Sequence, residues 1–188
     1  MCKKSFWIAF IFLGTSIFVK AQSSAAFLGP QVGWYKAADA DNSKFMIGGA
    51  FRTKLSPGFG LEGSINYRQE QYNNGYVTVT SWPVMVTALL YPVDFLYGAI
   101  GVGWYNTAFN YKSSLLYLGP TDQTEQKFGW HFGAGVQFPL SANAENPNTI
   151  LTADLRYVYL NYDFQKMPGA SDLKSDFVVL NIGLLFRL

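Results

Sequence analysis

The sequence predicts an all-β protein, specifically an eight-stranded antiparallel up-and-down transmembrane β-barrel. Three observations favour this fold. Segments in which apolar residues recur with a period of two follow one another along the chain and are separated by turn-type residues. Within these segments one face is apolar and carries large side chains, whereas the other mixes glycine with polar and charged residues. Aromatic residues make up 18% of the chain and charged residues only 14%, against about 25% charged residues in a typical soluble protein.

The first 21 residues are predicted to be a secretory signal peptide that is cleaved after Ala21. Two lysines precede an apolar run, which ends at Val19-Lys20-Ala21 and is too short to cross a bilayer as a helix. The only cysteine, Cys2, lies in this leader, so we expect residues 22–188 to fold as one barrel domain without disulfides. Basic and acidic residues nearly balance once the leader is removed, and no basic cluster indicates a nucleic acid partner.

The first four strands are predicted over residues 27–38, 44–54, 59–71 and 76–91. They end in turn at "DADNS", "LSPG", "YNNG" and "PVD", which are rich in residues that favour turns. The alternation is clear in the third segment, where Leu61, Ile65 and Tyr67 share one face while Glu62 and Arg68 share the other.

The last four strands are predicted over residues 95–112, 127–138, 150–164 and 176–188. In the sixth segment Phe128, Trp130 and Phe132 alternate with Gly129 and His131. The final segment continues its alternation to the last residue, so the chain ends within a strand. Such an ending is expected of a closed barrel, because the last strand must pair with the first when no water can satisfy an open edge.

Two barrels could use this alternation, and the tryptophans decide between them. A soluble lipocalin-like carrier would turn its apolar face inward, whereas a membrane barrel turns it outward to lipid. Glycine-rich faces suit the narrow interior of an eight-stranded barrel, which side chains fill. The four tryptophans of the mature chain lie on the apolar face and near one rim, as an aromatic belt requires: Trp34, Trp82, Trp104 and Trp130.

The C-terminal segment "NIGLLFRL" resembles the assembly signal of bacterial outer-membrane proteins, with Asn181, Gly183, Phe186 and Leu188 at its characteristic positions. Together with "FLYGAIGVGWY", "FGWHFGAGVQFPL" and "ADLRYVYLNY", this ending makes the mature chain similar to the small eight-stranded outer-membrane barrels, the OmpA- and OmpX-like β-barrel domains. The resemblance implies a Gram-negative outer-membrane protein, recognised by the barrel assembly machinery after secretion across the inner membrane, contacting outer-membrane lipids. We expect a monomer and, after Leu188, no peptidoglycan-binding domain.

Alternation places eight ionisable residues in the predicted lumen. We expect these residues to form a network of paired charges, because buried charges must pair. The predicted network consists of Arg52, Glu62, Arg68, Lys127, His131, Asp154, Arg156 and Arg187. A plugged interior is favoured, and a narrow small-solute channel gated by these charges is the alternative.

No motif predicts a catalytic, cofactor or metal site. His131 is the only histidine and Gly133 follows it two residues on, so the His–Ser pair of lipid A deacylases of similar barrel size is absent. We therefore expect a structural or surface-interaction role, with a lipid-modifying enzyme as a weaker alternative. The apolar loop over residues 112–126 is the predicted site of contact with an extracellular partner. The connection over residues 139–149 is long for a periplasmic turn, and nothing in the sequence explains it.

Overall fold

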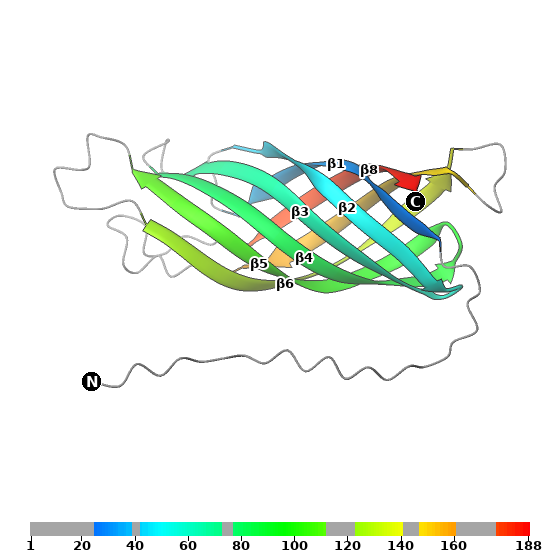
Figure 1. Cartoon of the computed structure of the whole chain (residues 1–188). Helices are drawn as coiled ribbons and strands as arrows, with labels where there is room; N and C mark the ends of the chain where they lie inside the picture. The colour runs from blue at the N-terminus through cyan, green and yellow to red at the C-terminus, as the bar shows by residue number, and fades with distance from the viewer. Residues whose placement is uncertain (1–24, 39–41, 73–76, 112–122, 141–146, 161–175) are drawn as a thin grey trace, which may run out of the picture.

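The computed structural model describes residues 25–38, 42–72, 77–111, 123–140, 147–160 and 176–188. These residues form a closed barrel in which every strand is antiparallel to its two neighbours (Figure 1), which confirms the predicted fold class. The predicted leader and parts of several connections lie outside the described residues. The strands are β1 (Ala26–Ala37), β2 (Lys44–Ser56), β3 (Phe59–Tyr72), β4 (Val77–Val93), β5 (Leu96–Tyr111), β6 (Gln123–Pro139), β7 (Thr149–Tyr159) and β8 (Phe177–Arg187).

The first and last strands close the barrel along nearly their full length. Their register runs from Phe27 opposite Arg187 to Ala37 opposite Phe177. The backbone N–H of Leu188 donates to the carbonyl oxygen of Ala26 at 2.9 Å. The last residues of β8 therefore supply hydrogen bonds that remove the sheet edge, as a strand surrounded by hydrocarbon requires.

The two ends of the barrel differ. At one end, here called the turn end, lie the start of β1, the end of β8 and the tight turns that join β2 to β3 and β4 to β5. The opposite end, here called the loop end, carries the β1–β2, β3–β4, β5–β6 and β7–β8 connections, much of which lies outside the described residues. The long connection between β6 and β7, over residues 140–148, joins these strands at the turn end. In Figure 1, β5 and β6 reach furthest at the loop end.

Four strands continue past the others at the loop end. Pairing of β2 with β3 stops at Met46 and Arg68, and pairing of β6 with β7 stops at Trp130 and Tyr159. Beyond these residues β3, β4, β5 and β6 stay paired with one another, as far as Phe109 opposite Gln123. We call this four-stranded sheet, formed by residues 69–72, 77–82, 106–111 and 123–128, the extension.

The extension corrects one predicted boundary. β6 begins at Gln123 rather than at residue 127, because residues 123–126 pair with the end of β5. The end of the predicted loop 112–126 is therefore strand, while residues 112–122 lie outside the described part of the chain. β7 ends at Tyr159, and most of the predicted continuation to residue 164 also lies outside it.

Candidate functional site

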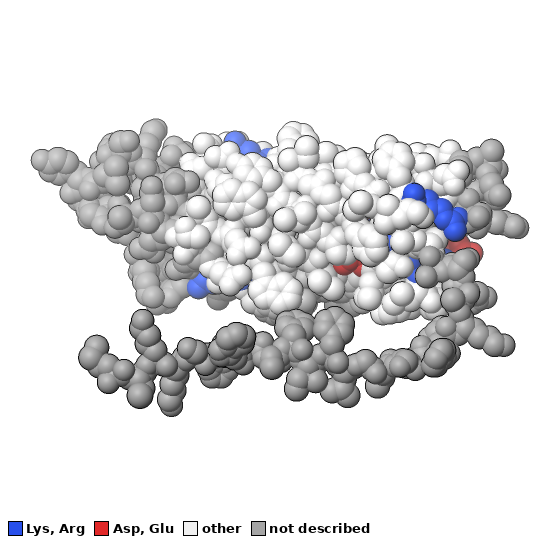
Figure 2. Space-filling view, in the orientation of Figure 1, with Lys and Arg blue, Asp and Glu red and all other residues white. Residues whose placement is uncertain are grey.

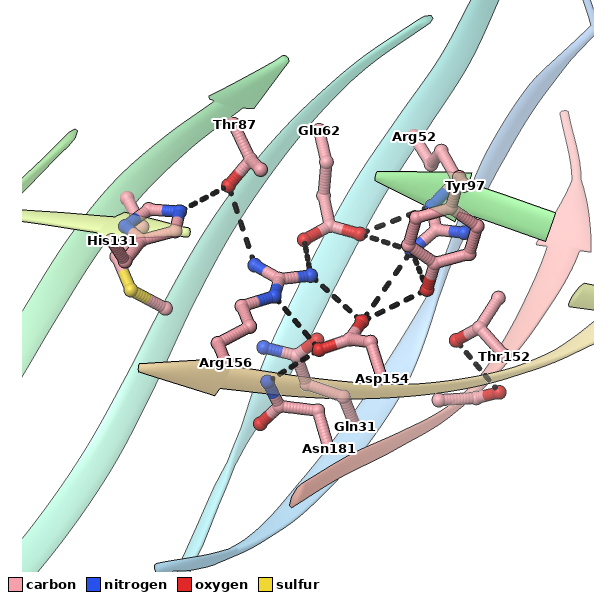
Figure 3. A network of polar contacts seen from close by, with 12 residues as sticks. Gln31, Arg52, Glu62, Thr87, Tyr97, His131, Thr152, Asp154, Arg156 and Asn181 are labelled. Atoms are coloured by element: carbon pink, nitrogen blue, oxygen red, sulfur yellow. Dashed lines mark hydrogen bonds and ion pairs between the residues drawn. The ribbon is translucent and has the colours of Figure 1, made fainter. Parts of the chain in front are cut away.

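The lumen is filled in three layers. At the turn end two clusters of buried apolar side chains are centred on Phe27 with Leu185, and on Leu89 with Tyr97. At the loop end a larger apolar cluster includes Met46, Tyr105 and Phe177. Between these layers lies a polar network from the inward positions of the strands (Figure 3).

Arg156 crosses the lumen. Arg156 on β7 places Nη2 2.7 Å from Oε1 of Glu62 on β3, and these strands lie on opposite sides of the closed sheet. The other carboxylate oxygen of Glu62 accepts two hydrogen bonds from Arg52 on the neighbouring strand, one of them from Nε at 3.0 Å. Glu62 therefore joins the guanidinium groups of both walls.

Asp154 completes the charge balance. Its Oδ1 accepts a hydrogen bond from Arg156 Nε at 2.7 Å, and its Oδ2 accepts one from the Tyr97 hydroxyl at 2.9 Å. Asn181 Nδ2 donates to Oδ1 at 3.0 Å. Two arginines thus face two carboxylates, and each of these four residues is 2% to 4% exposed. Burial without pairing would cost several kcal/mol per ion, so the pairing is what makes this arrangement stable.

His131 joins the network through Thr87. The Thr87 hydroxyl lies 2.9 Å from His131 Nε2 and accepts a hydrogen bond from Arg156 Nη1 at 3.3 Å. Space for the imidazole comes from Gly101, opposite His131 in the register. A Cβ at Gly101 would lie 2.7 Å from His131 Nε2, so no side chain fits there without displacement.

A second ion pair lies apart, within the loop-end apolar layer. Arg68 contacts Glu70 at 3.2 Å, and its guanidinium carbon sits 4.0 Å from the ring centroid of Phe177. The rings of Tyr35 and Tyr105 lie within 6 Å of the same guanidinium. Aromatic faces stabilise a buried cation, so this layer also closes the lumen.

The eight residues predicted as one network are thus divided. The structure brings together Arg52, Glu62, Asp154 and Arg156, and joins His131 to them through Thr87. Arg68 lies in the loop-end layer, whereas Lys127 and Arg187 are half-buried near opposite ends of the barrel. Sequence reasoning missed several inward residues that the same alternation indicates: Gln31, Glu70, Thr87 and Tyr97.

The outer wall is apolar between two aromatic girdles. All four predicted belt tryptophans point outward near the loop end and are 42% to 54% exposed. Phe51, Phe138 and Phe186 are exposed near the turn end. The segment from Trp130 to Phe138 rises about 20 Å along the barrel axis at 3.3 Å per residue and a tilt near 40°. Figure 2 shows a wall that is mostly free of charge.

The residues of the predicted assembly signal divide by face. Asn181 and Gly183 are buried in the lumen, Asn181 against Asp154 and Gly183 beside Thr152. Phe186 and Leu188 point outward and are exposed. Within the described ranges no group of His, Cys, Asp and Glu could hold a metal ion, and no helix is long and apolar enough to cross a membrane.

A family model described as "Outer membrane protein beta-barrel domain" matches residues 8–186. The chain belongs to this family. No curated protein matches the sequence. The orientation follows from the family, since outer-membrane barrels have short periplasmic turns and longer outer loops. We therefore expect the turn end to face the periplasm and the loop end to face outward.

Solved structures share the fold at low identity. A major outer membrane protein from Thermus thermophilus is 14% identical with a TM-score of 0.60, covering 87% of this chain and 99% of that one. Neisserial surface protein A is 14% identical with a TM-score of 0.54, covering 87% and 97%. Ail of Yersinia pestis, solved in complex with the heparin analogue sucrose octasulfate, is 18% identical with a TM-score of 0.50, covering 88% and 97%. The predicted resemblance to small eight-stranded outer-membrane barrels is confirmed.

Proposed function

We propose that this protein is a closed outer-membrane barrel that acts through its outward surface rather than as a channel. The observation that carries the proposal is the contact between Arg156 and Glu62 across the lumen. An eight-stranded barrel has an interior just wide enough for side chains. A bridge between opposite walls, with apolar layers above and below it, leaves the described lumen side chains packed against one another.

The electrostatics of the network also argue against conduction. Its two arginines and two carboxylates satisfy one another at 2.5–3.0 Å, so a permeating ion would have to compete with pairs that are already formed. Opening the path requires breaking buried pairs, which costs about 3–5 kcal/mol when one partner is removed. The lumen network is therefore a structural plug in this proposal.

The test is single-channel conductance of the refolded chain in planar bilayers. We expect no resolved steps for the native protein, and small steps for Arg156→Ser, which removes the crossing side chain. Lys54→Ser is the matched control, because Lys54 pairs with the exposed Asp94 at the turn-end rim of the barrel, away from the contact of Arg156 with Glu62, and its loss should leave the barrel closed. Regular conductance steps in the native protein would overturn the proposal.

The remaining expectations are also proposals. His131 is buried against Thr87 and faces the lumen, which argues against a lipid-modifying activity; His131→Ala should leave lipid A chemistry in cells unchanged. Exposed Phe186 and Leu188 at the end of β8 support recognition by the assembly machinery. We also propose that the chain is secreted through a signal peptide over residues 1–21 and that the 112–126 region contacts an extracellular partner. A monomer is expected, because the strands of one chain close the barrel without a second subunit.

A further inference from the structure

We propose that the outer face of the extension binds the neutral sugar units of the glycolipid that surrounds the barrel in the outer leaflet. The inference rests on the proposed function, because it names the partner of an outward surface.

The outer face changes its chemistry abruptly from one row of side chains to the next. Register and alternation align outward residues of β3, β4, β5 and β6 in rows across the sheet. The row at the top of the membrane band is wholly apolar: Ile65, Val84, Trp104 and Phe128. The next row is half aromatic and half amide: Tyr67, Trp82, Asn106 and Gln126. The rows above contain amides, hydroxyls and one small residue: Gln69, Thr80, Ala108 and Thr124, then Gln71 and Thr78. Thr80 is buried by its neighbours, whereas the other five are exposed or half-buried.

The height of these rows above the membrane interface indicates which molecule they contact. The mixed row holds two belt-level rings, Tyr67 and Trp82, whose centroids are 5.7 Å apart. The row of Gln71 lies about 10 Å above it at 3.3 Å per residue and a tilt near 40°. The extension therefore rises directly from the lipid interface into the layer where the glycolipid carries its sugars, and the proposed contact is continuous with the membrane contact.

The absence of charge defines which part of the glycolipid fits. None of the outward residues in these rows is Lys, Arg, Asp or Glu. Phosphate and carboxylate groups are recognised by Arg and Lys, so the charged base of the glycolipid is a poor match. Amide side chains offer both donors and acceptors to sugar hydroxyls, and aromatic faces offer apolar contact to a sugar ring.

The face also requires a cover. Water-exposed protein surfaces carry about 25–35% charged residues, whereas this face carries none in the rows named above. Beyond Arg68 and Trp130 the outer edges of β3 and β6 also lack a neighbouring strand within the described part of the chain, and unpaired, uncharged edges favour association. The amides of this face already engage one another, since Gln126 Nε2 donates to Asn106 Oδ1 at 3.0 Å and Asn106 Nδ2 donates to the Trp82 carbonyl at 3.4 Å. These bonds hold the amide side chains of Asn106 and Gln126 along the row, where they can contact the hydroxyl groups of a ligand.

The experiment measures glycolipid preference in vesicles. The refolded chain is placed in phosphatidylglycerol vesicles containing a dansyl-labelled lipopolysaccharide with its neutral oligosaccharide, or the same glycolipid truncated to its phosphorylated base. Energy transfer from the belt tryptophans reports the enrichment of each glycolipid around the barrel. We expect the native chain to prefer the glycolipid with neutral sugars, and the double variant Gln69→Ala/Gln126→Ala to lower that preference about three- to tenfold per amide removed.

Charge substitutions separate the sugar from the phosphate as partner. Both Gln126→Lys and Gln126→Glu should lower the preference if neutral hydroxyls are bound. A gain for Gln126→Lys with a loss for Gln126→Glu would overturn the inference in favour of anionic groups. Thr53→Ala/Thr149→Ala, on the outer face near the turn end, is the matched control and should have no effect.

Failure of this inference differs from failure of the proposed function. Conductance recorded on the same preparations reports the lumen independently of the sugars. Equal enrichment of the two glycolipids around a closed barrel overturns only the sugar contact, whereas regular channel steps overturn the closed barrel.

Discussion

Replacing Glu62 by glutamine should lower the free energy of unfolding by about 3 kcal/mol. Glu62 accepts two hydrogen bonds from Arg52 and one from Arg156, all buried. Hydrogen bonds to charged groups contribute about 1.5–3 kcal/mol each, and removing one partner of a buried ion pair costs about 3–5 kcal/mol. Glutamine introduces an amide that faces two guanidinium groups, so a loss of stability is expected. Because glutamine keeps the shape and one carbonyl acceptor, we expect a loss at the lower end of the range of about 3–5 kcal/mol.

The assay is urea unfolding in lipid vesicles, followed by tryptophan fluorescence and by the mobility of the unheated gel band. With a slope of about 2 kcal/mol/M, a loss of about 3 kcal/mol moves the midpoint down by about 1.5 M. Lys54→Met, at the exposed pair with Asp94, should change the free energy by less than about 1 kcal/mol. The double variant Arg52→Met/Glu62→Met should be more stable than Glu62→Met alone. In the single variant the Arg52 guanidinium stays buried after losing Glu62, whereas the double variant removes both charges. A loss below about 1 kcal/mol in Glu62→Gln would refute the view that the network stabilises the barrel.

Three further predictions concern the wall and its closure. Gly101→Ala should cost about 1–3 kcal/mol of unfolding free energy, because its Cβ would meet a packed ring and backbone, whereas Gly98→Ala points to open space and should be neutral. Trp130→Ala should cost at least about 1 kcal/mol by removing a ring stacked at 4.1 Å on Tyr159, and Trp130→Phe should recover part of it; equal unfolding midpoints for the two would contradict this reason. Deleting Leu188 should slow formation of the folded gel band, since it removes a hydrogen bond to β1, and an unchanged folding rate would count against that role.

Most of the fold was accessible from the sequence because the membrane imposes a strict rule on each strand. Lipid outside and a narrow lumen inside force a two-residue alternation, and the buried or exposed state of Phe128, Trp130 and His131 follows it. The start of β6 was misplaced because residues 123–126 are polar on the outer face, where the apolar signal ends although the strand continues.

The candidate site was accessible only in part. Alternation identifies which residues enter the lumen, but it does not give their height along the barrel or their partners across it. The separation of Arg68 from Arg52 depends on register between neighbouring strands, and the contact of Arg156 with Glu62 depends on a distance across the bore. Neither quantity is encoded in one segment taken alone.

The bridge between opposite walls has a consequence for the order of assembly. Arg156 and Glu62 are supplied by β7 and β3, so their contact forms only when nearly the whole sheet has curled round. A partly inserted, open sheet would expose these charges to hydrocarbon, where each costs several kcal/mol. Stepwise entry of single strands into lipid is therefore disfavoured, and insertion should be coupled to closure in one cooperative event. The buried charges that stabilise the closed barrel therefore destabilise its partly closed intermediates in the membrane.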